Sequence, residues 1–195
     1  MDAFFNYTGT FAKMSSGSRD ALTAVALQME LPKGQILLRP GAICHYIHFI
    51  EKGLSRTFYI KNGKDVTDWI STENSFAVSI VSFISRQPDR RGIELLEDSI
   101  LWAISWQDLE NLCSQHHEIE HLGRMLVGSG IMQLQQRFDE LHFATALQRY
   151  QTLMQLHPTL ISRVPLGVIA SYLGITQETL SRIRKSPRPL KGKRK

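Results

Sequence analysis

Residues 169–185 read I-A-S-Y-L-G-I-T-Q-E-T-L-S-R-I-R-K, a stretch in which a glycine separates two runs of helically spaced apolar residues. Ala170 is small where two helices would cross closely, and Gly174 can adopt the left-handed conformation that ends a helix. Thr176 is a favourable N-cap for a second helix. We therefore predict a helix-turn-helix with a buried apolar wedge, formed by Ile169, Leu173, Ile175, Leu180 and Ile183.

The second of these two helices has a polar outer face. In a helix-turn-helix the second helix enters the major groove of DNA. Arg182 can bond bidentately to guanine, Gln177 can read adenine, and Glu178 can accept from cytosine or hold Arg182 one turn away. The hydroxyls of Thr176 and Thr179 can reach phosphate. The predicted DNA-binding residues are Thr176, Gln177, Glu178, Thr179, Ser181, Arg182 and Lys185, and the alternative is a generic helical hairpin with a charged outer face.

Positive charge is concentrated at the C-terminal end of the chain. The whole chain carries a net charge of +5. Residues 163–195 hold nine basic residues and one acidic residue, a net charge of +8, while the preceding 162 residues hold 14 basic and 17 acidic residues, a net charge of −3. A basic end on a nearly neutral body indicates a polyanionic partner, such as double-stranded DNA. The alternative is that the final run, KSPRPLKGKRK, is a solvated basic tail.

The first part of the chain is predicted to be β-rich. Residues 1–18 are expected to form a flexible N-terminus, and residues 19–30 a short helix. Turn signals then separate short runs rich in Ile, Phe, Tyr, Val and Trp. Asn62-Gly63 is the strongest of these signals, because both central residues of a type I′ turn need positive φ. Short, evenly spaced antiparallel strands predict a jelly-roll or barrel-like sandwich over residues 19–115.

A long helix is predicted over residues 116–143. Four apolar residues in it step by three, four and three positions, as in a coiled-coil seam: Ile131, Leu134, Phe138 and Leu141. Such a seam is most simply buried against a second copy of the chain, although packing on its own β domain is the alternative. Gly128-Ser129-Gly130 interrupts the pattern, and each glycine costs about 1 kcal/mol in a helix. This segment therefore marks either a break or a close crossing of two backbones.

The capping-box pattern Thr145-x-x-Gln148 opens another helix, over residues 146–156. It marks the start of the C-terminal unit, predicted as a helix-turn-helix domain with a basic tail over residues 144–195.

The chain resembles the Crp/Fnr family of bacterial transcription regulators. The resemblance covers about residues 19–185 and is carried by the region from Val164-Pro165 to Lys185, by the helix A-L-Q-R-Y-Q-T-L-M and by the segment L-P-K-G-Q-I-L-L. It implies a cytoplasmic, homodimeric DNA-binding regulator, not an enzyme, with RNA polymerase as a further partner. The implied fold is α+β, with an N-terminal double-stranded β-helix or jelly-roll sensor domain like a cyclic-nucleotide-binding domain. A long dimerisation helix and a C-terminal helix-turn-helix domain complete it, with Gln177, Glu178 and Arg182 as base readers.

The expected effector pocket departs from the cyclic-nucleotide pattern of the family. That pattern reads roughly F-G-E-L and then, after a short helix, Arg-Ser-Ala; its Glu binds the ribose and its Arg binds the phosphate. Here Val78 and Ser79 replace the Gly and the Glu, and Arg90 stands for the phosphate arginine, followed by Arg91. Because the charge-assisted bonds of the Glu are lost, we expect an effector other than cyclic AMP, or none. The two arginines bind another anion or face water. The family's usual C-terminal wing is also missing, so the basic tail is expected to contact the DNA backbone.

Two patterns suggest metal sites. H-E-x-x-H occurs at His117–His121, with Glu118 as a base for zinc hydrolysis, but no third ligand follows at a common spacing. We interpret this run as the solvated start of the long helix. His45, His48 and Glu51 raise the alternative function, a cupin-like metalloenzyme with an accessory helical domain. Residues three apart in a strand point to opposite faces, so we expect these histidines not to share a metal, and we predict no metal site or cofactor.

The N-terminus and the cysteines indicate the cellular setting. The first 18 residues lack a basic region followed by an apolar run, so we predict no signal peptide. No apolar run approaches the ~18–20 residues that cross a membrane. With only two cysteines, Cys44 and Cys113, a disulfide framework is not expected, and a reduced cytoplasmic setting fits.

Overall fold

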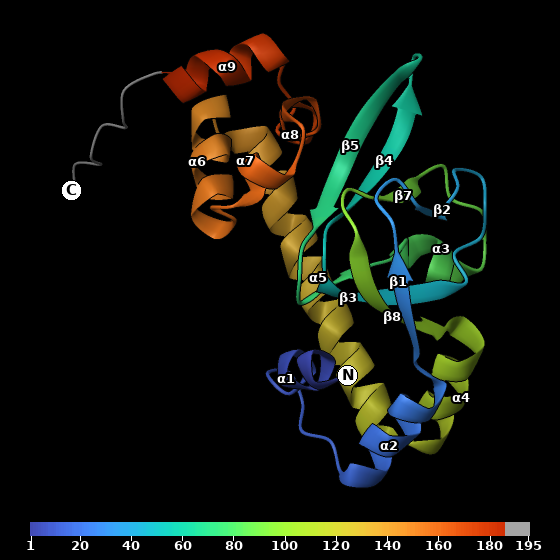
Figure 1. Cartoon of the computed structure of the whole chain (residues 1–195). Coiled ribbons are helices and arrows are strands. Elements are labelled where there is room, and N and C mark those ends of the chain that lie inside the picture. Colours follow the sequence, from blue (N-terminus) through green and yellow to red (C-terminus); the bar gives the residue numbers. More distant parts are fainter. Residues whose placement is uncertain (186–195) are drawn as a thin grey trace, which may run out of the picture. The chain divides into compact units, whose positions relative to one another are not determined.

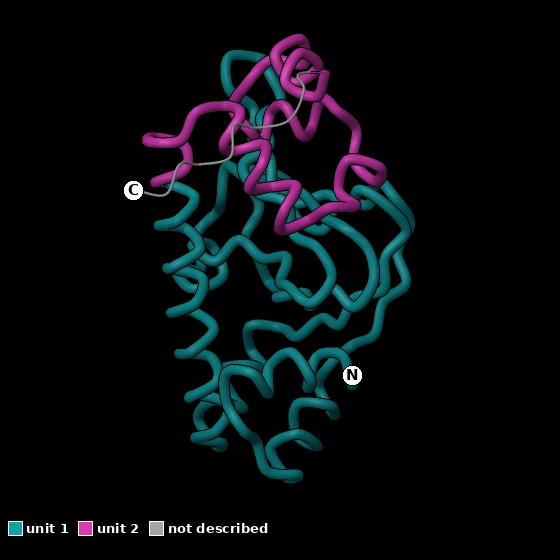
Figure 2. Tube along the Cα trace, turned by 90° about the vertical axis from the view of Figure 1, so that its left-hand side faces the viewer, with its two compact units in different colours: residues 1–138 teal, residues 139–195 magenta. Residues whose placement is uncertain are grey.

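The computed structural model describes residues 1–185, and the chain divides into two compact units, Met1–Phe138 and Asp139–Lys195 (Figure 2). The predicted basic tail therefore lies almost entirely outside the described residues.

Two four-stranded antiparallel sheets form the β-roll of the first unit (Figure 1). One sheet has the order β1 (Leu27–Leu31), β8 (Ser99–Ser105), β3 (Tyr46–Lys52) and β6 (Ser75–Ala77). The other has the order β2 (Ile36–Leu38), β7 (Gly92–Leu95), β4 (Ser55–Lys61) and β5 (Lys64–Ser71). The predicted α+β fold with an N-terminal β-roll is confirmed.

The turn between β4 and β5 has the predicted geometry. Asn62 and Gly63 have φ values of 51° and 72°, the positive values that a type I′ turn requires. The hairpin then pairs from Lys61 with Lys64 to Ser55 with Ser71.

The two sheets enclose one apolar core. Ile50 and Leu101 from one sheet cluster with Ile93 and Leu95 from the other, and each is at most 2% exposed. Burial of this order stabilises by roughly 1.5–3 kcal/mol per large aliphatic side chain. The core fixes the strand register, because a slip of one residue would turn these side chains outward.

The N-terminus differs from the prediction of a flexible segment. Residues 2–8 form helix α1 (Asp2–Thr8), and Phe4 is only 4% exposed. Its ring lies edge-on to Phe49 and Phe76, with centroid distances of 5.4 and 6.4 Å. Burial of this aromatic side chain on the β-roll, which the local sequence does not reveal, orders the segment.

The helix expected over residues 19–30 is also different in the structure. Helix α2 (Ser16–Val25) begins earlier, with the Ser15 side chain as its N-cap, and ends earlier. Residues 27–31 instead form β1, which pairs with β8 along its whole length. Pairing with a distant strand overrides the helical propensity of this short stretch.

Three further helices belong wholly or largely to the first unit. They are α3 (Ile80–Ser85), α4 (Trp106–Gln115) and α5 (His117–Phe143). Helix α5 continues through Gly128 and Gly130, so the predicted possibility of a break is wrong. In the described part of the chain, nothing lies within 4 Å of the position that a Cβ would take on either glycine.

The second unit is helical. It contains α6 (Ala146–Leu156), α7 (Leu160–Arg163), α8 (Leu166–Tyr172) and α9 (Gln177–Lys185). The Thr145–Gln148 capping box is confirmed, and the helix that follows has the predicted bounds. The buried apolar residues of these four helices and their connections are Leu153, Leu160, Val164, Ile169, Ala170, Leu173 and Leu180.

Among residues 1–185, no helix has the length and apolarity needed to cross a membrane.

Candidate nucleic-acid interface and effector site

The predicted turn between α8 and α9 is present. Gly174 has a φ of 65°, and its N–H donates to the Ser171 carbonyl at 3.0 Å. The Ile175 N–H donates to the Ala170 carbonyl, also at 3.0 Å, so these two bonds satisfy two of the orphan carbonyls at the end of α8. Ala170 is 1% exposed, as expected for a small residue at a close helix crossing.

Thr176 caps α9 as predicted. Its Oγ1 accepts from the Thr179 N–H at 3.2 Å. A hydrogen bond from Thr176 lowers the pKa of Glu178, and the charge of Arg182 acts in the same direction. Glu178 in the first turn and basic residues in the last turn also match the helix dipole.

The apolar wedge is smaller than predicted. Ile169, Leu173 and Leu180 are buried, whereas Ile175 and Ile183 are only half-buried. A nine-residue helix at the end of the described chain has few neighbours to cover the last turn.

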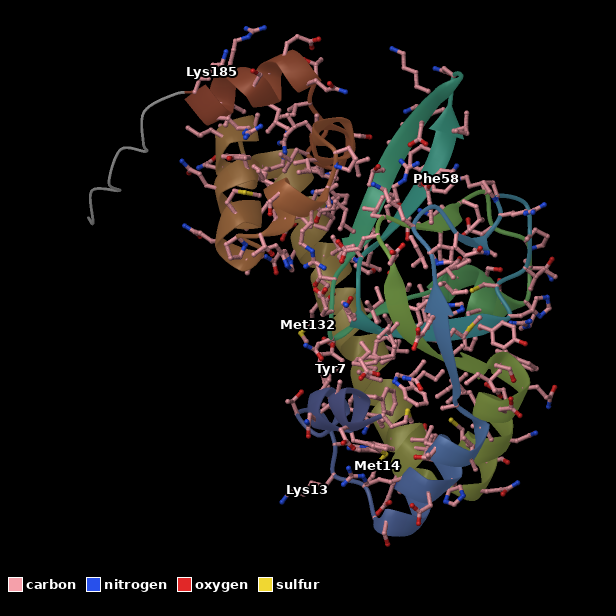
Figure 3. The ribbon with its side chains drawn as sticks, viewed as in Figure 1. Tyr7, Lys13, Met14, Phe58, Met132 and Lys185 are labelled. Atoms are coloured by element: carbon pink, nitrogen blue, oxygen red, sulfur yellow. The ribbon has the colours of Figure 1, made fainter. Side chains whose placement is uncertain are left out.

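Most of the predicted DNA-binding residues form an exposed polar ridge. Its members are Thr176, Gln177, Glu178, Arg182 and Lys185; Thr179 and Ser181 are half-buried on its flank. Lys185 marks the end of the ridge in Figure 3. The Gln177 amide leans back on α8, since its Nε2 lies 2.6 Å from where a Cβ on Gly167 would stand.

Sequence reasoning missed Arg149, which fastens this pair of helices to α6. Its Nε donates to the Leu173 carbonyl at 2.9 Å, and one terminal nitrogen donates to the Ala144 carbonyl at 2.6 Å. The Leu173 carbonyl is 24 residues away in the chain, a contact that no local pattern around Arg149 could indicate.

The apolar residues of α5 fall into a buried group and an exposed group, and the predicted seam is the exposed one. Ile119 and Leu122, near the start of the helix, are 2% and 3% exposed, and Ile119 packs into an apolar cluster of the first unit. The four seam residues are exposed: Ile131 62%, Leu134 54%, Phe138 53% and Leu141 43%. Met132, which extends from the same helix in Figure 3, is 69% exposed.

Of the four predicted effector residues, Ser79 and Arg91 meet at a shared partner, whereas Val78 and Arg90 lie apart from it. Val78 packs against the β-roll core, and Ser79 is buried. Arg90 is exposed, with its guanidinium 6.0 Å from the centre of the Tyr59 ring. The Arg91 Nε donates to an Asp68 oxygen at 2.7 Å, an interaction that raises the pKa of Arg91.

Asp89, which sequence reasoning missed, connects two of these residues. The Ser79 hydroxyl donates to its Oδ2, and the Arg91 backbone N–H donates to its Oδ1 at 3.1 Å. An acid immediately before Arg90-Arg91 was the available signal.

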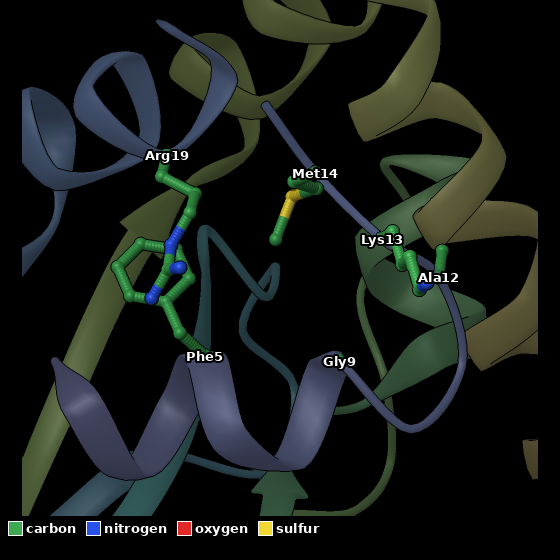
Figure 4. A pocket seen from close by; sticks show the side chains of 6 residues that line it. All are labelled: Phe5, Gly9, Ala12, Lys13, Met14 and Arg19. Carbon is green, nitrogen blue, oxygen red and sulfur yellow. The ribbon is translucent and has the colours of Figure 1, made fainter. Parts of the chain in front are cut away.

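An open cavity of about 240 Å³ lies elsewhere in the first unit (Figure 4). It is lined by Phe5, Gly9, Ala12, Lys13, Met14 and Arg19, none of which was a predicted effector residue. The Arg19 guanidinium stacks on the Phe5 ring at 4.4 Å, inside this lining.

The residues of the two metal patterns have other roles. His45 contacts Arg86 at 3.1 Å, His48 is buried, and Glu51 accepts from the Trp102 indole, so these three do not converge. Glu118 accepts from the Ser15 N–H at 2.8 Å and from its hydroxyl at 2.7 Å. These bonds, with one from Ser18, lower the pKa of Glu118 to about 2, so it fastens the start of α2.

Comparison with known proteins supports the architecture. The model described as the cyclic nucleotide-binding domain matches residues 28–116. FixK2 from Bradyrhizobium japonicum has a TM-score of 0.68 at 18% identity, over 82% of this chain and 83% of that chain. A protein from Eubacterium rectale assigned to the Crp/Fnr family has a TM-score of 0.68 at 15% identity, over 87% and 82%. The c-di-GMP responsive regulator CLP from Xanthomonas campestris has a TM-score of 0.63 at 18% identity, over 88% and 90%.

No curated protein matches the chain. Because these solved structures are only 15–18% identical to this chain, their likeness establishes the fold alone. Residues 28–116 are thus similar to the cyclic nucleotide-binding domain. The chain's architecture of β-roll, long helix and C-terminal helices is that of the Crp/Fnr regulators, so the resemblance in the sequence is confirmed.

Proposed function

We propose that this protein is a homodimeric transcription regulator that binds double-stranded DNA through α9. The exposed polar ridge of α9, held by the turn at Gly174, carries the proposal. Arg182 and Gln177 are suited to guanine and adenine, and Glu178 is suited to cytosine or to positioning Arg182.

The exposed part of α5 supports dimerisation. Four large apolar side chains spaced as a coiled-coil seam are at least 43% exposed in a single copy. Burying them against a second α5 removes this apolar area from water. Gly128 and Gly130 have open space around them, which would let two backbones approach. A two-fold dimer would present two α9 helices, which must be about 34 Å apart to enter successive major grooves.

The proposed mechanism couples the β-roll to the DNA. A local change in the β-roll shifts the start of each α5, and with it the spacing of the two α9 helices. Small changes of spacing then give large changes of affinity. RNA polymerase is the further partner we propose, and binding to it and to DNA would place the protein in the cytoplasm.

We propose that the β-roll binds an effector other than cyclic AMP, or none. Ser79 occupies the position expected for a ribose-binding carboxylate, and its hydroxyl is engaged by Asp89. CLP, with a similar fold, is described as responsive to c-di-GMP, so the fold does not by itself specify cyclic AMP.

A selection from a random duplex pool tests the proposed function. The full chain should enrich a palindromic site with half-sites one helical turn apart. Binding to it should weaken steeply with salt, because phosphate contacts release counterions. Failure to enrich any sequence at low salt would contradict the proposal.

A further inference from the structure

The loop between α3 and β7 surrounds one buried carboxylate. The Asp89 side chain is 7% exposed. Its Oδ2 accepts from the Ser79 hydroxyl, and its Oδ1 accepts from the Arg91 N–H at 3.1 Å. The Arg91 guanidinium adds a positive charge 3.6 Å from Oδ1. A hydroxyl, a backbone N–H and a guanidinium are the donors that proteins use to bind carboxylate or phosphate groups.

This donor set is itself held in place. Asp68 on β5 accepts from the Arg91 Nε at 2.7 Å and so fixes the guanidinium. Ser79 is 4% exposed, and its Oγ also accepts from the Ser82 N–H at 3.4 Å. The three donors are therefore organised around a single anionic position, and the protein's own carboxylate fills it.

Backbone contacts fasten the same loop to the segment before β3. The Gly41 N–H donates to the Asp89 carbonyl at 2.6 Å, and the Asp89 N–H donates to the Ala42 carbonyl at 3.1 Å. Arg86, earlier in the loop, donates to the Cys44 carbonyl at 2.8 Å. Three hydrogen bonds to other groups of the chain thus anchor the loop.

We propose that Asp89 is a built-in anion that occupies the anion position of this cyclic nucleotide-binding-type domain and excludes phosphate-bearing ligands from it. An incoming phosphate would meet a buried like charge and would find Ser79 and Arg91 already bonded. The loop therefore keeps its conformation without a ligand. The consequence that DNA binding needs no nucleotide rests on the proposed function.

Chemical rescue tests the built-in anion. The variant Asp89→Ala removes the carboxylate and leaves space beside the three donors. We expect its Tm to fall by at least about 5 °C, since a buried anion partner is lost. Formate or inorganic phosphate at millimolar concentration should restore at least half of this loss, with saturation. The wild type should show no rise in Tm with formate, phosphate, cyclic AMP or c-di-GMP.

Asp98→Ala is the matched control, because the Asp98 carboxylate lies in an exposed turn, where it accepts from the Lys33 N–H at 2.8 Å. A general salt effect would raise the Tm of both variants equally and would overturn the proposal. So would an unchanged Tm for Asp89→Ala, a loss without rescue, or saturable nucleotide binding by the wild type. Should Asp89→Ala fail to fold in chloride buffer, circular dichroism in formate buffer decides: folding supports the proposal and failure overturns it.

The DNA consequence has its own experiment. Wild-type protein without nucleotide should bind the selected duplex as tightly as protein with added cyclic AMP. A tenfold gain on adding nucleotide would overturn the proposal. Absence of DNA binding, with the rescue result intact, would count against the proposed function alone.

Discussion

Arg182 is the residue on α9 from which we expect the clearest sequence readout. Its guanidinium is exposed on the polar ridge, one turn after Glu178. Arg182→Ala should cost about 1–3 kcal/mol on the selected site and relax the preference at one base position. Fluorescence anisotropy with the selected site, and with each of the three other base pairs at every position of it, measures this preference. Arg184→Ala, on the same helix, is the control and should weaken binding to all sequences alike; the same uniform loss for Arg182→Ala would contradict its role as a base reader.

A substitution at Gly167 tests the position of the Gln177 side chain. An alanine at Gly167 would push away the Gln177 amide, which is the flexible end of its side chain. We expect Gly167→Ala to leave unfolding free energy unchanged or to raise it by up to about 1 kcal/mol, since alanine favours a helix. The base preference attributed to Gln177 should change. In the Gln177→Ala background, Gly167→Ala should have no further effect on sequence preference; a persisting effect would argue against contact between the two.

His48 gives the β-roll a defined response to acid. Burial lowers the pKa of His48 to about 4, from an ordinary value of about 6.5. Between these values the unfolded chain binds a proton that the folded chain does not. The contribution of neutral His48 to the unfolding free energy is therefore fully present above about pH 6.5 and is lost as the pH falls toward 4. Between about pH 7 and about pH 4.5, the Tm of the wild type should fall more than that of His48→Phe. Parallel curves would contradict the assignment, since the other titrating groups are common to both proteins.

The residues that could be predicted from the sequence are those whose roles are local. Gly174 and Thr176 act within one turn of the chain, and both have the expected geometry. Arg149 and Asp89 act on partners in other segments. The acid before Arg90-Arg91 was the one local signal for Asp89, and the folded chain alone brings Leu173 to Arg149 and Ser79 to Asp89.

Helix α5 is the element on which the proposed dimer depends. Leu134→Glu places a charge in the exposed seam and should convert the dimer to a monomer, because a buried unpaired charge is costly. Light scattering after size exclusion measures the mass. Gln133→Glu, one residue away on an exposed position, should leave the dimer intact. A wild-type protein that is already monomeric at micromolar concentration would contradict the proposed dimer.

Helix α6 holds α8 and α9 through Arg149. Arg149→Ala leaves the carbonyls of Leu173 and Ala144 without this charged donor and should lower the unfolding free energy of the second unit by about 1.5–3 kcal/mol. Urea denaturation followed by circular dichroism measures the loss. Arg39→Ala, on an exposed site in the first unit, is the control and should change stability little. Equal stability of both variants would show that the two bonds contribute nothing.

Helices and strands that begin or end at a strong capping or turn sequence could be predicted. Those that form only by pairing or packing with a distant segment could not. The capping box set the start of α6, and Asn62-Gly63 set the β4–β5 hairpin. In contrast, residues 27–31 form a strand only because β8 lies beside them. Helix α1 is similarly ordered by the aromatic rings of Phe49 and Phe76.

At the scale of the whole chain, the succession of short strands, a long helix and capped short helices was sufficient to predict the architecture. Each of these patterns has its own period, and the fold follows from their order. The start of the C-terminal domain stays a prediction. The C-terminal unit begins at Asp139, within α5, whereas the sequence placed the start at residue 144 after the helix.

Helix α5 is continuous, so a tilt at one end displaces the other end. Its 27 residues span about 40 Å at 1.5 Å per residue. A tilt of only about 5° at its first turn would carry its last turn through roughly 3–4 Å, close to the 3.4 Å rise of one base pair. A helix broken at Gly128 would absorb such a tilt at the break. Under the proposed function, a continuous helix would transmit the tilt without such a loss, and a displacement too small to repack the β-roll would put a half-site out of step with the double helix.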